Sequence, residues 1–286
     1  MRKYFLPLLA ILLILGGCGV PAESDVSSDM PSTEKAASSL PELSPLAELS
    51  APAVVTEGRE PTDHDRLPDQ LWQNPIADDD FPLLVAELPE ANAAFYGLQW
   101  DTALIRWGDC QAEFDWPWLT PHQILPRLFC LDFDDDHEDE LVVICHTGSG
   151  TGVAYQELHV LEKSPEGTLT DYALPWELFS EELTSALSVA TVNNRTYSIL
   201  GTQLVDITAN LPEDADPADI EGLRAGDIVY FEATPDSPFW GNHFRYQGSA
   251  CLTGEPFPRT SCYVTNLDAC VLYKDGRFTL SDIHLS

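Results

Sequence analysis

The sequence predicts a mainly β protein: an antiparallel sandwich, a barrel-like or a propeller-like sheet domain with one or two short helices. Short apolar runs follow one another from residue 94 to residue 280, turn-forming residues separate them, and one stretch alone has a helical apolar period. Short strands bounded by turn residues are typical of antiparallel β folds. The chain has 286 residues, of which 44% are hydrophobic, so it can bury a sizeable core. An α+β arrangement stays open as an alternative.

The apolar runs define the expected strands. These are Ala94–Leu98, Ala103–Trp107, Gln111–Trp116, Leu128–Phe133, Leu141–His146, Val153–Leu161, Thr196–Leu200, Ile228–Ala233, Cys262–Asn266, Val271–Tyr273 and Phe278–Leu280. Asp275-Gly276 separates the last two runs and predicts a hairpin, because this pair accepts the positive φ angles of a tight turn. Asn193-Asn194 is a weaker signal of the same kind.

One helix is expected near the middle of the chain. Trp176, Phe179, Leu183 and Leu187 recur at helical spacing, and Pro175 precedes them at a position where a helix tolerates proline. An apolar stripe of this kind predicts packing against the core. A second, short helical turn is expected to begin at Thr120.

Residues 1–17 have the layout of a bacterial lipoprotein signal peptide. A basic start is followed by an apolar run from Tyr4 to Leu15. That run is shorter than the roughly 20 residues that a membrane-spanning helix needs. Leu15-Gly16-Gly17-Cys18 resembles the lipobox, which implies cleavage before Cys18 and a diacylglycerol on its thiol. The alternative is an ordinary secretory signal, and both interpretations place the protein outside the cytoplasm.

The segment after the signal peptide predicts a flexible tether. Residues 19–70 contain no Phe, Trp or Tyr and are rich in Ser, Ala, Pro and acidic residues. Such a composition buries too little apolar surface to offset the entropy of ordering. We therefore expect residues 18–70 to be a disordered acidic tether that begins with the lipidated Cys18. Residues 71–286 are expected to form one β-rich globular domain.

The net charge limits the classes of partner. The chain carries 14 Lys and Arg against 47 Asp and Glu, a formal net charge of -33. Binding to nucleic acid depends on basic side chains that displace counterions from phosphates, so nucleic acid is excluded as a partner. The lipid anchor is instead expected to attach the protein to the membrane, and a cell-wall glycan or another envelope protein is the expected ligand.

An acidic loop between two apolar runs is the sharpest motif. Asp132, Asp134, Asp136 and Glu140 occupy positions 1, 3, 5 and 9, and Glu138 at position 7 can offer its carbonyl oxygen. Oxygen ligands that converge in this way suit Ca²⁺. The pattern resembles the calcium loop of FG-GAP and VCBS-type β repeats, which implies a Ca²⁺ site at these five residues.

One residue departs from that family pattern. His137 stands where the repeats have glycine, and a residue other than glycine at positive φ is strained. The alternative to a Ca²⁺ site is therefore a solvated acidic loop that has lost its ion.

Two acids close to tryptophans suggest contact with a glycan. Glu113 and Asp115 are two residues apart, so on a strand they share one face, and Trp107 and Trp116 lie near them in sequence. A glycosidase uses such a pair of carboxylates, whereas a non-catalytic site uses the same residues for binding. The third interpretation is that the tryptophans belong to the core and the acids are solvated.

Six cysteines follow Cys18, namely Cys110, Cys130, Cys145, Cys251, Cys262 and Cys270. An even number in an exported chain permits three disulfides, with fifteen connectivities. Cys130 and Cys145 flank the acidic loop, and Cys251 and Cys262 bracket a proline-rich loop. Free, buried thiols are the alternative, because a cysteine packs well as a small hydrophobe.

Several short motifs, taken together, resemble one family. They are Phe95-Tyr96-Gly97-Leu98, Phe114-Asp115-Trp116, Leu119-Thr120-Pro121, Ile124-Leu125-Pro126, the acidic loop, Gly148 to Val153, and Glu157-Leu158-His159-Val160. In this order they are similar to an extracytoplasmic domain of clostridia-type bacteria. That domain occurs in free-standing lipoproteins and in fusions with membrane metallopeptidases of the β-lactam-sensor type. The resemblance implies ligand recognition or sensing, and no peptidase half is present.

These features together predict a bacterial cell-surface lipoprotein with a non-catalytic, Ca²⁺-stabilised domain for binding or sensing. Two other classes stay open: a hydrolase acting on cell-wall glycans, and a structural envelope protein without a small ligand. The identity of the ligand and the oligomeric state do not follow from the sequence.

Overall fold

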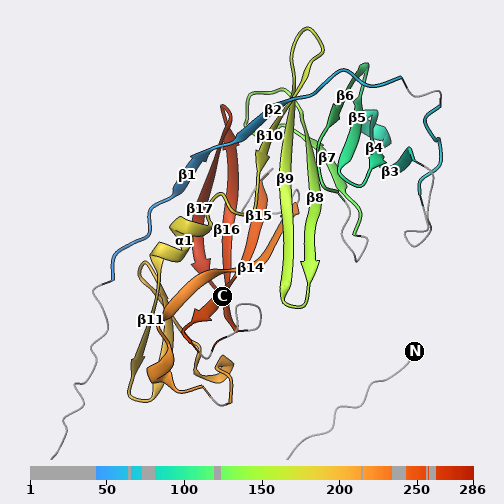
Figure 1. Cartoon of the computed structure of the whole chain (residues 1–286). Coiled ribbons are helices and arrows are strands. Elements are labelled where there is room, and N and C mark those ends of the chain that lie inside the picture. The colour runs from blue at the N-terminus through green and yellow to red at the C-terminus, as the bar shows by residue number, and fades with distance from the viewer. Residues whose placement is uncertain are drawn as a thin grey trace, which may run out of the picture. The chain divides into compact units, whose positions relative to one another are not determined.

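The computed structural model describes residues 43–63, 66–72, 81–118, 124–213, 215–233, 243–255, 257 and 262–286 (Figure 1). Strands make up 59% of the structure, and most strand pairs are antiparallel. This confirms the prediction of a mainly β fold. None of the sheets in the described ranges closes into a barrel.

Ten strands form the largest sheet. Eight follow one another in the order β1 (Leu49–Pro52), β17 (Arg277–Leu285), β16 (Tyr263–Lys274), β15 (Phe244–Thr253), β14 (Gly222–Ala233), β9 (Val153–Lys163), β10 (Leu169–Leu174) and β2 (Val54–Glu57). β8 (Glu140–Gly150) also pairs with β9, and β7 (Arg127–Leu131) pairs with β8. The β9–β14 contact is the parallel one.

Two smaller sheets complete the fold. β3 (Leu83–Leu88), β4 (Ala93–Gln99), β5 (Thr102–Trp107) and β6 (Cys110–Phe114) form a four-stranded antiparallel sheet. β11 (Leu187–Val192), β12 (Arg195–Leu200) and β13 (Gln203–Asp206) form a three-stranded one. Short 3₁₀ helices occur at η1 (Pro89–Ala91), η2 (Thr208–Asn210) and η3 (Pro217–Asp219).

Strands β8 and β9 are buried on both faces, which explains their nearly continuous apolar sequence. Val142 and Val160 pack in one hydrophobic cluster with residues of β14 to β17. Val143 and Leu161, on the opposite face, pack in a second cluster with residues of β3 to β6. The two strands therefore separate two hydrophobic cores. The face of the strand on which an apolar side chain lies decides which core it joins.

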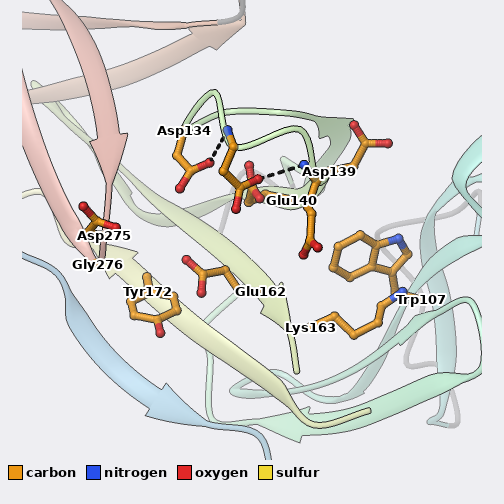
Figure 2. A pocket seen from close by; sticks show the side chains of 11 residues that line it. Trp107, Asp134, Asp139, Glu140, Glu162, Lys163, Tyr172, Asp275 and Gly276 are labelled. Atoms are coloured by element: carbon orange, nitrogen blue, oxygen red, sulfur yellow. Dashed lines mark hydrogen bonds between the residues drawn. The ribbon is translucent and has the colours of Figure 1, made fainter. Parts of the chain in front are cut away.

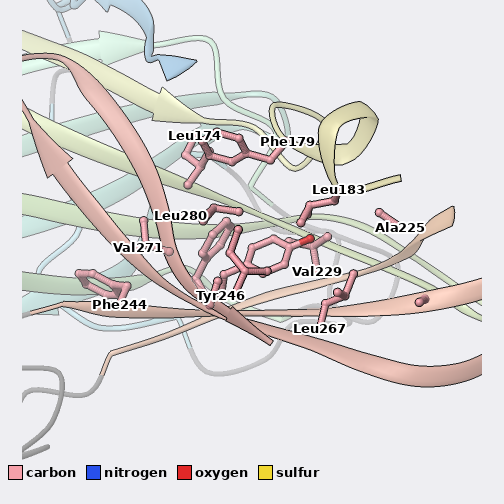
Figure 3. Packing of buried hydrophobic residues seen from close by; sticks show 14 of the residues in the cluster. Leu174, Phe179, Leu183, Ala225, Val229, Phe244, Tyr246, Leu267, Val271 and Leu280 are labelled. Carbon is pink, nitrogen blue, oxygen red and sulfur yellow. The ribbon is translucent and has the colours of Figure 1, made fainter. Parts of the chain in front are cut away.

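The predicted helix is shorter than its apolar stripe. α1 spans Ser180–Ala186, and a turn precedes it. The stripe nevertheless packs as expected, because Phe179, Leu183 and Leu187 are buried in the first cluster and Trp176 is partly buried against it. Figure 3 shows Phe179 and Leu183 pointing from this segment toward the strands that carry Val229 and Tyr246. Thr120 lies outside the described residues.

Each predicted strand overlaps an observed one, with one difference in number. Cys262–Asn266 and Val271–Tyr273 belong to the single long strand β16. The Asp275-Gly276 turn joins β16 to β17 with φ angles of 50° and 70°, as predicted. The Asn193-Asn194 turn, with φ angles of 50° and 62°, joins β11 to β12.

The expected boundary of the tether at residue 70 is wrong. β1 pairs with β17 and β2 pairs with β10, so residues 49–57 belong to the large sheet. These strands pair through backbone hydrogen bonds; Leu49 and Ala51 of β1 are partly buried against the first cluster, whereas Val54 and Val55 of β2 are half exposed. The predicted signal peptide and Cys18 lie outside the described residues. No helix in the described ranges is long and apolar enough to cross a membrane.

Candidate functional site

The acidic loop connects β7 to β8 and gathers three carboxylates. Oxygen atoms of Asp132, Asp134 and Asp136 all lie within 4.8 Å of one another. Backbone donors hold this arrangement: the Asp136 N–H donates to Asp132 Oδ1 at 3.0 Å and to Asp134 Oδ1 at 3.1 Å. The His137 N–H donates to Asp132 Oδ2 at 3.0 Å. Such a cluster could hold a metal ion, as the sequence predicted for these three residues.

The loop has a left-handed backbone at two of its residues. His137 adopts a φ of 76°, and Asp135 adopts a φ of 63°. His137 therefore takes a conformation that glycine adopts at lower cost. Its side chain is exposed, with Nδ1 3.6 Å from Asp132 Oδ2, so the imidazole does not fill the space between the carboxylates.

Glu140 closes the loop at the start of β8. Its side chain is 4% exposed, and Oε2 accepts the Phe133 N–H at 2.7 Å. Burial raises the pKa of Glu140 to about 7; the Phe133 hydrogen bond opposes this rise, and the charges of Asp134, Asp136 and Asp132 add to it. Burial, followed by the charge of Asp136, also raises the pKa of Asp134. A cation among these carboxylates would reverse both effects.

A cavity of about 400 Å³ adjoins the loop (Figure 2). The loop contributes Asp134, Asp136, Glu138, Asp139 and Glu140 to its wall, and the Glu138 side chain is not one of the three clustered carboxylates. The opposite wall is aromatic and charged, with Trp107, Glu162, Lys163, Tyr172 and Asp275.

Two contacts order that opposite wall. The Lys163 ammonium lies 4.1 Å from the centre of the Trp107 ring, within the range of a cation–π contact. The Tyr273 hydroxyl donates to Glu162 Oε1 from behind the wall. Lys163 is the one basic side chain among the described residues that line the cavity, which is therefore strongly acidic.

The predicted glycan residues do not form one site. Glu113, Asp115 and Trp116 line a second cavity of about 330 Å³, whereas Trp107 lines the first. Arg59 bridges the two acids, with Nε 3.1 Å from Glu113 Oε2 and Nη1 2.6 Å from Asp115 Oδ1. Both carboxylates are thus engaged by one guanidinium that joins the N-terminal segment to β6.

Trp116 presents no open ring face to a sugar. Phe114 stacks on it at 4.5 Å between ring centres, and His159 stacks on it at 4.1 Å. The ring is 4% exposed and belongs to the second hydrophobic cluster. The interpretation of the tryptophans as core residues therefore describes Trp116 better than stacking on a glycan does.

Sequence reasoning missed a buried polar cluster at the second cavity. His159 Nδ1 lies 3.0 Å from Asp171 Oδ2, and the Trp116 Nε1–H donates to the same oxygen at 3.0 Å. His159 and Asp171 are each 2% exposed. The sequence offered one signal of this cluster, namely that Glu157 and His159 are two residues apart on β9 and so share a face. It could not show that Asp171 of β10 and Trp116 lie beside them.

The cysteines do not form the disulfides that the sequence permitted. Cys110, Cys130, Cys145, Cys251 and Cys270 are free thiols. Cys130 lies opposite Leu141 and Cys145 lies opposite Glu157, so the strand register does not bring these two cysteines together across the acidic loop. Burial raises the pKa of Cys251 and Cys270 to about 11, so these thiols behave as small apolar side chains. Cys262 is buried beside β15, where its carbonyl accepts the Leu252 N–H at 2.9 Å.

The fold and the loop define a mainly β protein with an acidic cluster able to hold a cation. Comparison of the chain with protein-family models, with curated proteins and with solved structures finds no match.

Proposed function

We propose that the chain is a lipid-anchored, extracytoplasmic binding protein in which Ca²⁺ in the acidic loop stabilises a non-catalytic β domain. The observation that carries this proposal is the convergence of Asp132, Asp134 and Asp136, with their oxygens within 4.8 Å of one another. Backbone hydrogen bonds already hold the carboxylates in place, so an ion would find much of its cage formed.

The ligand chemistry favours Ca²⁺ over other metals. The clustered groups are carboxylates, and the loop offers further oxygens at Glu138 and Glu140. A set made of oxygens selects hard cations, and Ca²⁺ accepts the six to eight ligands and irregular geometry of such a loop. Burial is the main cause of the raised pKa of Glu140, and the charges of Asp134, Asp136 and Asp132 add to it, so a cation beside them would offset that smaller part.

The neighbouring cavity supports a role in binding. Aromatic and charged side chains face each other across it, and the ion would lie at its wall. The engagement of Glu113 and Asp115 by Arg59 weighs against the hydrolase alternative, because a general acid and base must be free to exchange protons. We infer a cell-wall glycan or an envelope protein as the ligand, with the lipid on Cys18 as the membrane attachment.

Thermal unfolding of the full chain with Ca²⁺ and with a chelator tests the ion. A ligand at a hundred times its dissociation constant stabilises the folded state by about 2.7 kcal/mol, so the midpoint should rise clearly with Ca²⁺. Asp134→Asn should abolish the rise. Asp275→Asn is the matched control, because Asp275 lines the same cavity from the β16–β17 turn and should leave the rise intact. Equal midpoints with and without Ca²⁺ would refute the site.

A further inference from the structure

The second cavity has a metal-binding arrangement of another chemical type at its buried end. Cys145 on β8 lies directly opposite Glu157 on β9, and His159 follows two residues after Glu157. Residues two apart on a strand share a face with their cross-strand neighbours. The three side chains therefore point together into the layer between the large sheet and the four-stranded sheet.

The orientation of His159 is fixed as in a metal ligand. Its Nδ1 is held at 3.0 Å by Asp171 Oδ2, and its ring is stacked on Trp116. Metal-binding histidines regularly use one ring nitrogen for a carboxylate in this way and the other for the ion. The other nitrogen, Nε2, lies 3.8 Å from Glu157 Oε2 and beside the Cys145 thiol.

Burial makes the environment of His159 Nε2 significant. Nε2 is buried and has no hydrogen-bond partner of normal geometry, and the same holds for Asp171 Oδ1. A buried polar atom without a partner is costly, and a bound ion or water is one of its few explanations. Glu157 and His159 both line the cavity, so a further ligand or water can reach an ion held there.

We propose that Cys145, Glu157 and His159 form a binding site for a thiophilic divalent transition metal, of which Zn²⁺ is the representative. Sulfur, nitrogen and oxygen ligands suit Zn²⁺, whereas Ca²⁺ takes oxygens. Three protein ligands with a fourth position open to a cavity is the arrangement of an accessible zinc site. This site is independent of the Ca²⁺ loop, which lies at the other cavity.

Metal binding requires one movement and the loss of two protons. The three ligand atoms are not all within 4.8 Å of one another, as those of Asp132, Asp134 and Asp136 are, so the Glu157 carboxylate must turn toward Cys145. The thiol and the Nε2–H each release a proton to solvent as the bonds to the metal form. Two positive charges leave and two arrive, so the net charge of the buried cluster does not change.

Cobalt titration of the full, chelator-stripped chain tests the site, because Co²⁺ bound to a thiolate gives an intense charge-transfer band. We expect this band in the wild type at one equivalent of metal, with Zn²⁺ displacing Co²⁺ and millimolar Ca²⁺ leaving it in place. Cys145→Ser should abolish the band. Cys251→Ser is the matched control, because Cys251 is equally buried but lies on β15, and this variant should keep the band.

Two more variants make every outcome decisive. Glu157→Gln keeps the thiolate and should retain the band while weakening affinity at least tenfold. Asp134→Asn should change neither quantity, which separates this site from the Ca²⁺ loop. Absence of the band in the wild type, or its persistence in a folded Cys145→Ser variant, overturns the proposal. If circular dichroism shows that Cys145→Ser is unfolded, unchanged Co²⁺ affinity in Glu157→Gln overturns it instead.

Discussion

The Glu140 carboxylate accepts the Phe133 backbone N–H at 2.7 Å and so ties the two ends of the acidic loop together. Phe133 is buried in the first hydrophobic cluster, which anchors this contact to the core. The loop therefore starts and ends on fixed points, and a change in the charge of Glu140 acts directly on the geometry of the carboxylates between them.

The contribution of Glu140 to the stability of the metal-free protein should fall as pH rises. The pKa of Glu140 is about 7 in the folded state, above its ordinary value of 4.5. A raised carboxyl pKa contributes stability that is fully present below about pH 4.5 and is lost as pH rises through 7. We expect urea unfolding in chelator to show a loss of about 1–3 kcal/mol from this group between pH 4.5 and 8.

Glu140→Gln should remove most of that pH dependence, since the amide does not ionise. The exposed Glu166→Gln variant is the control and should keep the wild-type slope. A Glu140→Gln variant with the same slope as the wild type would contradict the assignment.

His137→Gly should stabilise the loop. A left-handed conformation costs a residue other than glycine roughly 1–2 kcal/mol, and glycine loses about 0.5–1 kcal/mol of this gain to unfolded-state entropy. We expect a net gain of up to about 1 kcal/mol in the free energy of unfolding, with tighter Ca²⁺ binding. Asn194→Gly, at a φ of 62° in the β11–β12 turn, should leave Ca²⁺ affinity unchanged. Loss of stability in His137→Gly would refute the argument from φ.

Arg59→Ala should destabilise the fold. The substitution removes the ion-pair partner of Glu113, which is 3% exposed, while the Thr62 N–H and hydroxyl still donate to Glu113 Oε1. Loss of the countercharge of a buried carboxylate costs about 1–3 kcal/mol. Arg195→Ala is the control, because Arg195 and Asp206 form an exposed pair that contributes less than about 1 kcal/mol. Equal free energies of unfolding for the two variants would show that Arg59 is not a structural link.

Removing residues 43–58 should destabilise the fold, because these residues contain β1 and β2 of the large sheet. A chain that begins at residue 43 keeps β1 and β2, whereas one that begins at residue 59 loses them and exposes the edges of β17 and β10. We expect the shorter chain to unfold at lower temperature and to aggregate more readily, since unprotected strand edges promote association. Equal midpoints would mean that residues 43–58 add nothing to the fold.

The sequence predicted the parts of the fold that depend on local pattern. The apolar runs that became β8 and β9 and the Asp275-Gly276 hairpin carry their signals within a few residues. β1 and β2 carry none, because they are held by backbone bonds to strands more than a hundred residues away. The division between two cores is also invisible locally, because neighbours such as Val142 and Val143 are equally apolar and differ only in the face they occupy.

The same distinction applies to the sites. The acidic loop could be predicted because its ligands are consecutive in sequence, and its spacing alone brings Asp132, Asp134 and Asp136 together. The cluster around His159 could not, because it depends on the register of β8, β9 and β10. Sequence proximity also did not place all four residues of the glycan prediction together: Trp107 and Trp116 are near in sequence but line different cavities.

Calorimetric titration of the chelator-stripped full chain with Ca²⁺ tests the central claim most directly. The account predicts saturable binding of one ion per chain in the wild type, retained in Asp275→Asn and lost in Asp134→Asn. Absence of saturable Ca²⁺ binding by the wild type, or unchanged binding in Asp134→Asn, would contradict it.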